Sequence, residues 1–174
     1  IFGIGFALRE ANPRLKIAAI EGLGSTLTLW HAYLRAKGKG YQTAKAAIQK
    51  ALRAYRRAGM SVSLKSHPRR KNPEEWFEID IDFPPTWTGV VGIEGLGVGN
   101  PTNLILRHLL EVDETQIITD KQAAEGVRLL DSHVIHAVAS AGANFFAATK
   151  LAKRLERLGK RGLIVTIVTG ASRS

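Results

Sequence analysis

The last third of the chain constrains the fold most, because it predicts a helix, a glycine turn and a buried strand in direct succession. Between Phe145 and Leu158, apolar residues recur at the three- and four-residue spacing of one buried helical face. Gly159 and Gly162 mark a turn, and residues 163–168 form an unbroken, largely β-branched run. Such a run is typical of a strand in a parallel sheet that is covered on both faces. We therefore predict the second half of a βαβ unit here.

The beginning of the chain has the same plan. Residues 1–11 have apolar positions on one helical face, and Asn12-Pro13 ends the helix because proline disfavours helical backbone in the residue before it. Leu15 to Ile20 follows as a buried strand, which Glu21-Gly22 closes. Two such units predict an α/β fold, an open and mostly parallel sheet with helices on both faces in a three-layer αβα arrangement.

A small basic α+β insertion is predicted to interrupt this fold over residues 23–86. It would contain helices over 26–36 and 43–58, the second with Thr43 as N-cap. Apolar and polar residues then alternate over 60–65 and 77–83, the pattern of two half-exposed strands. The main body would thus comprise residues 1–22 and 87–174.

The main body is predicted to resume after Pro84-Pro85. A strand and a glycine-rich loop are expected over 90–99, a helix over 104–110 and a short strand over 115–119. Asp120 is the expected N-cap of a further helix that reaches about Leu130.

All of the excess positive charge lies between His31 and Glu75. This segment holds twelve Lys or Arg and two Glu, a net charge of +10, whereas thirteen basic and thirteen acidic residues cancel elsewhere. One interpretation is a solvated face that keeps the insertion soluble. The alternative is a nucleic-acid or anionic-surface binding module. Its contacts would come from a basic helix and a basic loop: Lys45, Lys50, Arg53, Arg56, Arg57, Arg69, Arg70 and Lys71.

Composition excludes several other classes. The chain has no cysteine, so disulfides and thiolate–metal sites are excluded, and its five histidines are too scattered to predict a metal site. No segment approaches the roughly 20 apolar residues of a membrane-spanning helix, so we expect no membrane association and a cytoplasmic location. Because the chain begins at Ile1 and Met60 is its sole methionine, we expect it to begin inside a longer protein or after processing.

Two segments are candidates for ligand binding. The loop at 92–99 has four glycines, which allow a backbone to approach a ligand closely, although a tight turn without a ligand is the alternative. It lacks the third glycine of a dinucleotide fingerprint, and Pro101 follows, so we do not predict a nicotinamide site. Residues 138–144 form the opening of the last helix, where backbone N–H groups face a polar or anionic ligand in such folds.

Several segments, in the correct order, resemble the cysteine synthase and cystathionine β-synthase family of pyridoxal-phosphate enzymes (fold type II, tryptophan synthase β-like). The glycine loop is similar to the family's Ile-Gln-Gly-Ile-Gly-Ala-Gly loop, and residues 138–144 are similar to its Gly-Ile-Ser-Ser-Gly-Ala-Asn helix opening. The resemblance covers about 100 of the 174 residues. The similar segments are Ile1–Pro13, Leu15–Glu21, Gly92–Gly99, Ile117–Leu130 and Val138–Leu158.

This resemblance implies a pyridoxal 5'-phosphate cofactor and an amino-acid substrate, such as an activated serine, that undergoes β-replacement or β-elimination by a lyase or transferase. It also implies a homodimer as the full-length protein. The family's Schiff-base lysine and phosphate cup belong to its earlier half, so residues 1–174 alone are expected to be inactive. The implied cofactor contacts are Gly95, Leu96, Gly97, Ser140, Ala141 and Gly142.

One implied contact departs from the family pattern. The second serine of the family's Ser-Ser-Gly binds the pyridine nitrogen, but Ala141 stands at that position and has no side-chain donor. Ser140 lies one residue earlier. Either Ser140 takes over this contact or the site is altered.

Overall fold

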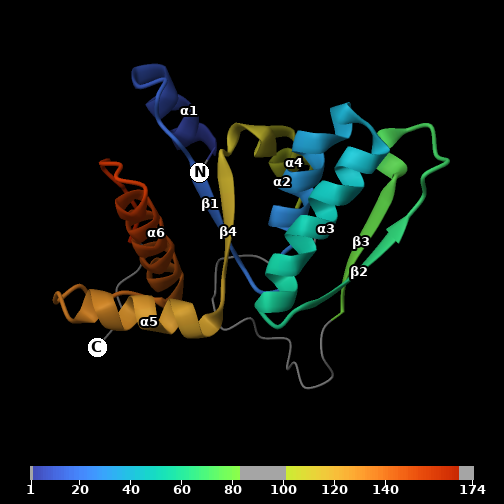
Figure 1. The fold of residues 1–174 in the computed structure, drawn as a ribbon. Helices are drawn as coiled ribbons and strands as arrows, with labels where there is room; N and C mark the ends of the chain where they lie inside the picture. The colour runs from blue at the N-terminus through green and yellow to red at the C-terminus, as the bar shows by residue number, and fades with distance from the viewer. Residues whose placement is uncertain (1, 83–100, 169–174) are drawn as a thin grey trace.

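The computed structural model describes residues 2–82 and 101–168, and its helices and strands confirm a mixed α/β chain (Figure 1). Short 3₁₀ turns η1, η2 and η3 lie at Lys37–Lys39, Pro73–Glu75 and Leu109–Glu111. The longer elements, in chain order, are α1 (Phe2–Ala11), β1 (Ala18–Gly22), α2 (Leu27–Ala36), α3 (Tyr41–Arg57), β2 (Ser61–Ser66), β3 (Phe77–Asp82), α4 (Asn103–His108), β4 (Glu114–Ile118), α5 (Asp120–Asp131) and α6 (Ala139–Arg157).

The main sheet in the described ranges consists of β1 and β4, which pair in parallel with Ala18 opposite Glu114. Asp113 holds the beginning of this pair, because its carboxylate accepts hydrogen bonds from Ile17 N–H at 2.8 Å and from Lys16 Nζ at 3.1 Å and pairs with Arg9. Burial alone would raise the pKa of Asp113, but these three partners together lower it. Because Ile17 N–H is bound by the side chain of Asp113, strand pairing starts at Ala18, three residues later than predicted.

Helices lie on either side of this strand pair. Ile20 and Ile118 pack against α6, whereas Ala19, the neighbour of Ile20 in β1, packs with Leu27 of α2. Figure 1 shows α5 and α6 on one side of β1 and β4, with α2, α3 and the β2–β3 hairpin on the other. An α/β fold is thus confirmed in its coarse form, while the larger open sheet stays a prediction.

The largest core lies between α2, α3 and the antiparallel β2–β3 hairpin. The apolar residues of α3 recur at helical spacing and are buried against both neighbours, as the sequence predicts. The fully or nearly buried residues of this core are Leu29, Tyr33, Ala36, Ala44, Ile48, Leu52, Tyr55, Met60, Phe77 and Ile79.

Two predicted N-caps are wrong by one or more residues. Helix α3 begins at Tyr41 after Gly40, whose φ of 92° suits glycine, so Thr43 lies in the first turn and its hydroxyl donates to Lys39 O instead. Helix α5 is capped by Thr119 rather than Asp120. Thr119 forms a capping box with Gln122, which satisfies two backbone N–H groups reciprocally.

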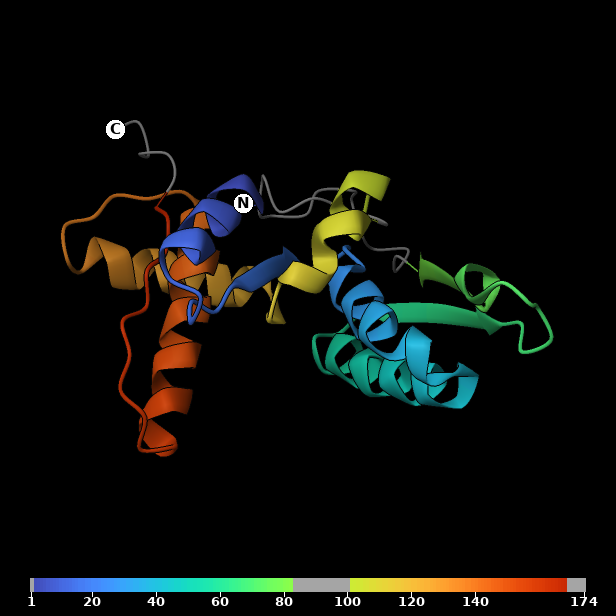
Figure 2. The same ribbon diagram turned by 90° about the horizontal axis from the view of Figure 1, so that it is seen from above.

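The predicted strand over 163–168 is also wrong. These residues form no strand, and 92% of Leu163 and 80% of Val165 are exposed. The segment runs beside α6 (Figure 2), where Asn144 Nδ2 donates to Ile167 O at 3.0 Å. A strand forms only when a neighbour accepts its backbone hydrogen bonds, and none of the four described strands pairs with this run.

The two predicted domains share a helix in the structure. Leu29 and Tyr33 of α2 belong to the core of the predicted insertion, yet Leu27 and Leu34 of the same helix pack against Ala19 and the η3 turn. The division at residues 22 and 87 stays a prediction, and α2 would link its two parts. Across the described segments, no helix combines the length and apolarity needed to cross a membrane.

Candidate functional site

The first turn of α6 lies at the carboxyl edge of the β1–β4 pair. Near the start of α6, Ala143 packs with Ile118 from the end of β4. Near the end of α6, Arg154 Nη2 lies 2.5 Å from a carboxylate oxygen of Glu114, at the beginning of β4. The helix therefore runs antiparallel to β4. Its N-cap is Val138, whose side chain accepts no hydrogen bond from the first-turn N–H groups. In α/β folds, ligands bind at this edge.

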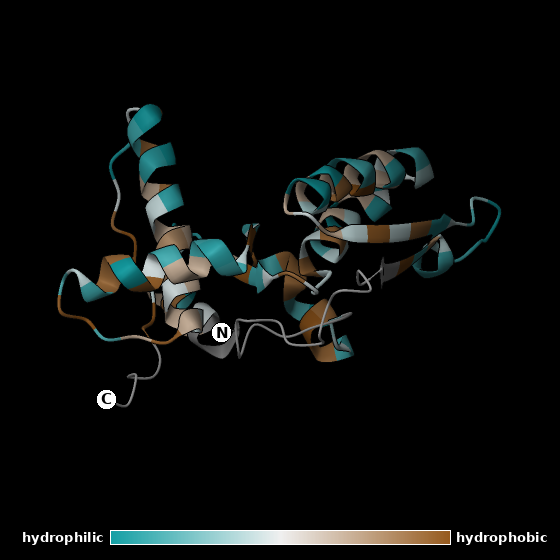
Figure 3. Cartoon of the chain, turned by 90° about the horizontal axis from the view of Figure 1, so that it is seen from below, coloured by the Kyte–Doolittle hydropathy of each residue, from teal (hydrophilic) through white to brown (hydrophobic). Residues whose placement is uncertain are grey.

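The residues of this first turn face different surroundings. Ser140 is half-buried, Ala141 is fully buried with Leu130, and Gly142 is buried against α5. Figure 3 shows that α6 is mostly hydrophobic near its start and becomes hydrophilic toward its end. The structure thus brings the three predicted contact residues to the right edge, but only Ser140 combines partial exposure with a polar side chain.

Gly142 and Gly126 allow α6 and α5 to cross closely. A Cβ atom on Gly142 would lie 2.3 Å from Ala123 O, and one on Gly126 would lie 2.0 Å from Gly142 O. No side chain fits at either position, so helix packing alone accounts for both glycines. This packing role was not predicted, although the small-residue run at 137–143 and the isolated Gly126 are its signal.

The fit of these residues to pyridoxal phosphate is therefore partial. Ser140 has a hydroxyl that suits a ring nitrogen, and the uncapped first turn of α6 suits a polar group. Ala141 and Gly142 do not fit as direct contacts, since their surroundings are occupied by α5 and its neighbours. Gly95, Leu96 and Gly97 lie outside the described residues. The cofactor stays a prediction.

A buried carboxyl group lies at the same edge, near the end of β1. Glu21 is 1% exposed, and its Oε1 accepts hydrogen bonds from Thr28 N–H at 3.0 Å and from the Tyr55 hydroxyl at 2.8 Å. Burial raises the pKa of Glu21, although these bonds oppose the shift. The hydrogen bond between Glu21 and Tyr55 was not predicted, because Tyr55 lies 34 residues away and no local pattern joins it to Glu21.

Replacing Glu21 with glutamine should remove a pH dependence from stability. Because the folded-state pKa of Glu21 is raised, its contribution to stability is complete below the unfolded pKa and is lost as pH rises through the folded pKa. As pH rises from about 4 toward the raised folded-state pKa, wild type should lose about 1.4 kcal/mol of stability relative to Glu21→Gln for each unit by which the pKa is raised. Urea unfolding at several pH values measures this difference. Parallel pH profiles for wild type, Glu21→Gln and the exposed control Glu125→Gln would contradict it.

Among the histidines, His31 is buried and bonded to the backbone. His31 Nε2 bonds to Val112 O at 2.8 Å, and burial lowers the pKa of His31, which favours the neutral ring. Within residues 2–82 and 101–168, no three His, Asp or Glu side chains lie close enough together to hold a metal ion. This part of the chain therefore offers no candidate metal centre.

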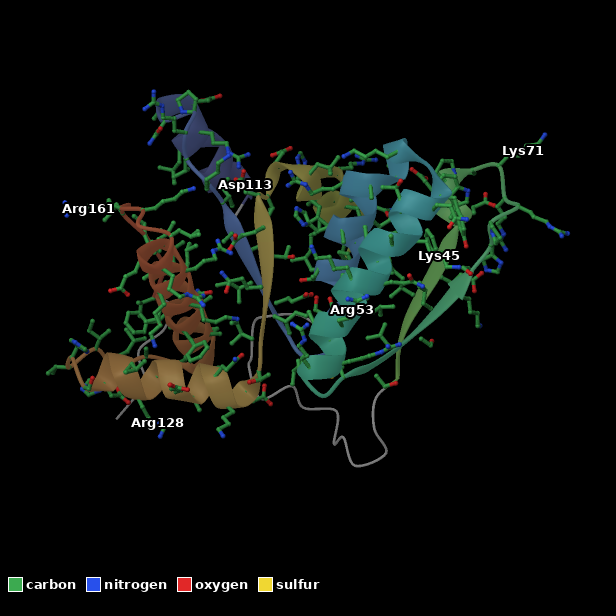
Figure 4. All side chains as sticks on the ribbon, in the orientation of Figure 1. Lys45, Arg53, Lys71, Asp113, Arg128 and Arg161 are labelled. Carbon is green, nitrogen blue, oxygen red and sulfur yellow. The ribbon has the colours of Figure 1, made fainter. Side chains whose placement is uncertain are left out.

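The predicted cationic residues form two groups at the surface. On α3, Lys50, Arg53, Arg56 and Arg57 are exposed and Lys45 is half-buried. Arg69, Arg70 and Lys71 are exposed in the loop between β2 and β3. Figure 4 shows Lys45 and Arg53 along α3 and Lys71 at the far end of the hairpin.

Comparisons with known proteins identify no relative, so a function is inferred from the geometry described above. No protein-family model matches the chain, no curated protein matches it and no solved structure matches it.

Proposed function

We propose that residues 1–174 are the C-terminal part of a pyridoxal-phosphate enzyme of the cysteine synthase type, with the three-layer αβα domain of that family. One observation carries the proposal: the uncapped first turn of α6 lies at the carboxyl edge of the parallel β1–β4 pair. That turn belongs to the segment 138–158, which resembles the family's cofactor-binding helix. Position and resemblance thus point to the same residues.

Ser140 is the proposed side-chain contact of the cofactor. Its hydroxyl would bind the pyridine nitrogen in place of the serine that Ala141 replaces, while first-turn N–H groups of α6 would face polar atoms of the ligand. Once bound, the cofactor supplies the electron sink for β-replacement or β-elimination on an amino acid. The Schiff-base lysine and phosphate cup would precede Ile1. A homodimer in the cytoplasm is part of the same proposal.

Replacing Ser140 with alanine should weaken cofactor binding in the full-length enzyme. Loss of one neutral hydrogen bond costs about 1 kcal/mol, so the cofactor Kd should rise about five- to tenfold. Titration of the apoenzyme, followed by the visible absorbance of the bound cofactor, measures this change. Ser132→Ala is the control, because Ser132 is exposed after α5 and its hydroxyl donates to Leu129 O. Equal Kd values for Ser140→Ala and wild type would show that Ser140 makes no cofactor contact.

A further inference from the structure

The exposed face of α3 carries one sign of charge. Helix α3 has no acidic residue, and its apolar side is buried in the core of the molecule. We define the α3 cationic face as Lys45, Lys50, Arg53, Arg56 and Arg57.

No acidic residue in the described ranges pairs with the α3 cationic face. Basic residues outside α3 do form ion pairs: Arg9 pairs with Asp113, and Lys37 Nζ lies 3.7 Å from Glu74 Oε1. Lys50, Arg53 and Arg57 lie three or four residues apart in turn, so their like charges repel and destabilise the helix. The helix dipole favours cations only in the last turn, where Arg56 and Arg57 lie, which leaves Lys45, Lys50 and Arg53 unexplained. A surface that serves only solubility usually mixes both signs.

Three features suit a duplex nucleic acid. The 17 residues of α3 extend about 25 Å, and an α-helix fits the major groove of a duplex. Arginine forks bind phosphate well, and α3 supplies three. Gln42 and Gln49 lie exposed on the same helix and can bond to base edges.

A lipid surface is a poorer partner. Basic helices that bind membranes also present large apolar side chains to the bilayer. Among the described residues, every exposed large apolar side chain lies outside α3. The apolar side of α3 is already buried against α2 and the β2–β3 hairpin. Duplex nucleic acid therefore matches this face better.

The β2–β3 loop offers a second contact. Its backbone is held by His67 N–H, which donates to Trp76 O at 2.8 Å, and by Trp76 Nε1, which donates to Arg70 O at 2.9 Å. The guanidinium nitrogens of Arg70 lie 3.7 Å from a carboxylate oxygen of Glu75 and 3.9 Å from one of Glu78. These acidic neighbours offset part of the charge of Arg70. Arg69 and Lys71 have no ion pair with the described residues. Figure 4 shows Lys71 beyond the α3 end that carries Lys45.

We propose that the α3 cationic face binds double-stranded nucleic acid through its backbone phosphates, with Arg69 and Lys71 as flanking contacts. This binding is separate from the proposed cofactor site at α6. It does not require the chain to belong to a pyridoxal-phosphate enzyme.

The test compares two triple variants of equal net charge. One is Lys50→Gln, Arg53→Gln and Arg57→Gln on α3, and the control is Lys150→Gln, Lys153→Gln and Arg157→Gln on the exposed side of α6. Both remove three cations and keep polar side chains of similar helix propensity. Fluorescence anisotropy with a labelled DNA duplex of about 20 base pairs, roughly two helical turns, gives Kd between about 50 and 200 mM salt.

The α3 triple variant should bind the duplex at least about tenfold more weakly at the lowest salt, and its slope of log K against log salt should be smaller by about 3. The α6 triple variant should retain the wild-type slope to within about 1. Circular dichroism should show both variants folded. Equal weakening by the two variants would assign binding to net charge and overturn the proposal. So would binding of wild type to vesicles of anionic lipid but not to the duplex.

Discussion

Gly126→Ala should destabilise the chain by at least about 2 kcal/mol, although alanine is the better helix former by about 1 kcal/mol. The added Cβ would lie 2.0 Å from Gly142 O and 2.7 Å from Gly142 C, both backbone atoms. No change of side-chain rotamer relieves such a contact, so α5 and α6 must move apart. Thermal unfolding should show a Tm lower by at least about 4–8 °C.

Gly38→Ala is the matched control for Gly126→Ala. Gly38 lies in the η1 turn, and a Cβ there meets nothing within 4 Å. This variant should be as stable as wild type or slightly more so, because alanine restricts the unfolded chain. If Gly126→Ala raised the Tm like Gly38→Ala, the close crossing of α5 and α6 would be wrong, and with it the account of Gly142.

Leu29→Ala should cost about 2–5 kcal/mol, because its side chain is fully buried between α2, α3 and the hairpin. The structure also predicts how the loss spreads. Since α2 packs on both the hairpin core and the β1–β4 region, the whole chain should unfold at lower urea in one transition. Urea unfolding followed by tryptophan fluorescence and by circular dichroism measures both effects.

The matched control for Leu29→Ala is Leu158→Ala. Leu158 is 60% exposed, so the same substitution should change stability by no more than about 0.5 kcal/mol. Two separate transitions, of which Leu29→Ala shifts one alone, would instead support an insertion that folds independently over residues 23–86.

Periodicity predicted the helices well, because each of the long ones buries one face against a neighbour. The apolar spacing in α3 and α6 placed both helices to within a few residues. The alternating pattern likewise predicted β2 and β3. Local signals failed where a partner decides the structure. An apolar, β-branched run such as 163–168 predicts a strand, yet the structure gives it no neighbouring strand to bond.

The candidate site was predictable only in part for the same reason. Resemblance placed Ser140, Ala141 and Gly142 together, but only the structure shows that Gly142 packs against Ala123 O and Val127 of α5. The Glu21–Tyr55 hydrogen bond joins two elements 34 residues apart, so no local sequence pattern announces it. Charge counting found the basic segment, whereas the structure shows that α3 carries five of its cations on one face, without an acidic partner among the described residues.

The most direct test of the proposed function is to locate the cofactor's covalent attachment. The full-length protein is loaded with pyridoxal phosphate, reduced with borohydride and digested, and mass spectrometry then identifies the modified lysine. The proposal predicts one modified lysine, upstream of Ile1, because Lys150, Lys153 and Lys160 are exposed on or just after α6 and offer no enclosed site for a nucleophile. No modified lysine at all, or a modified lysine within residues 1–174, would contradict it.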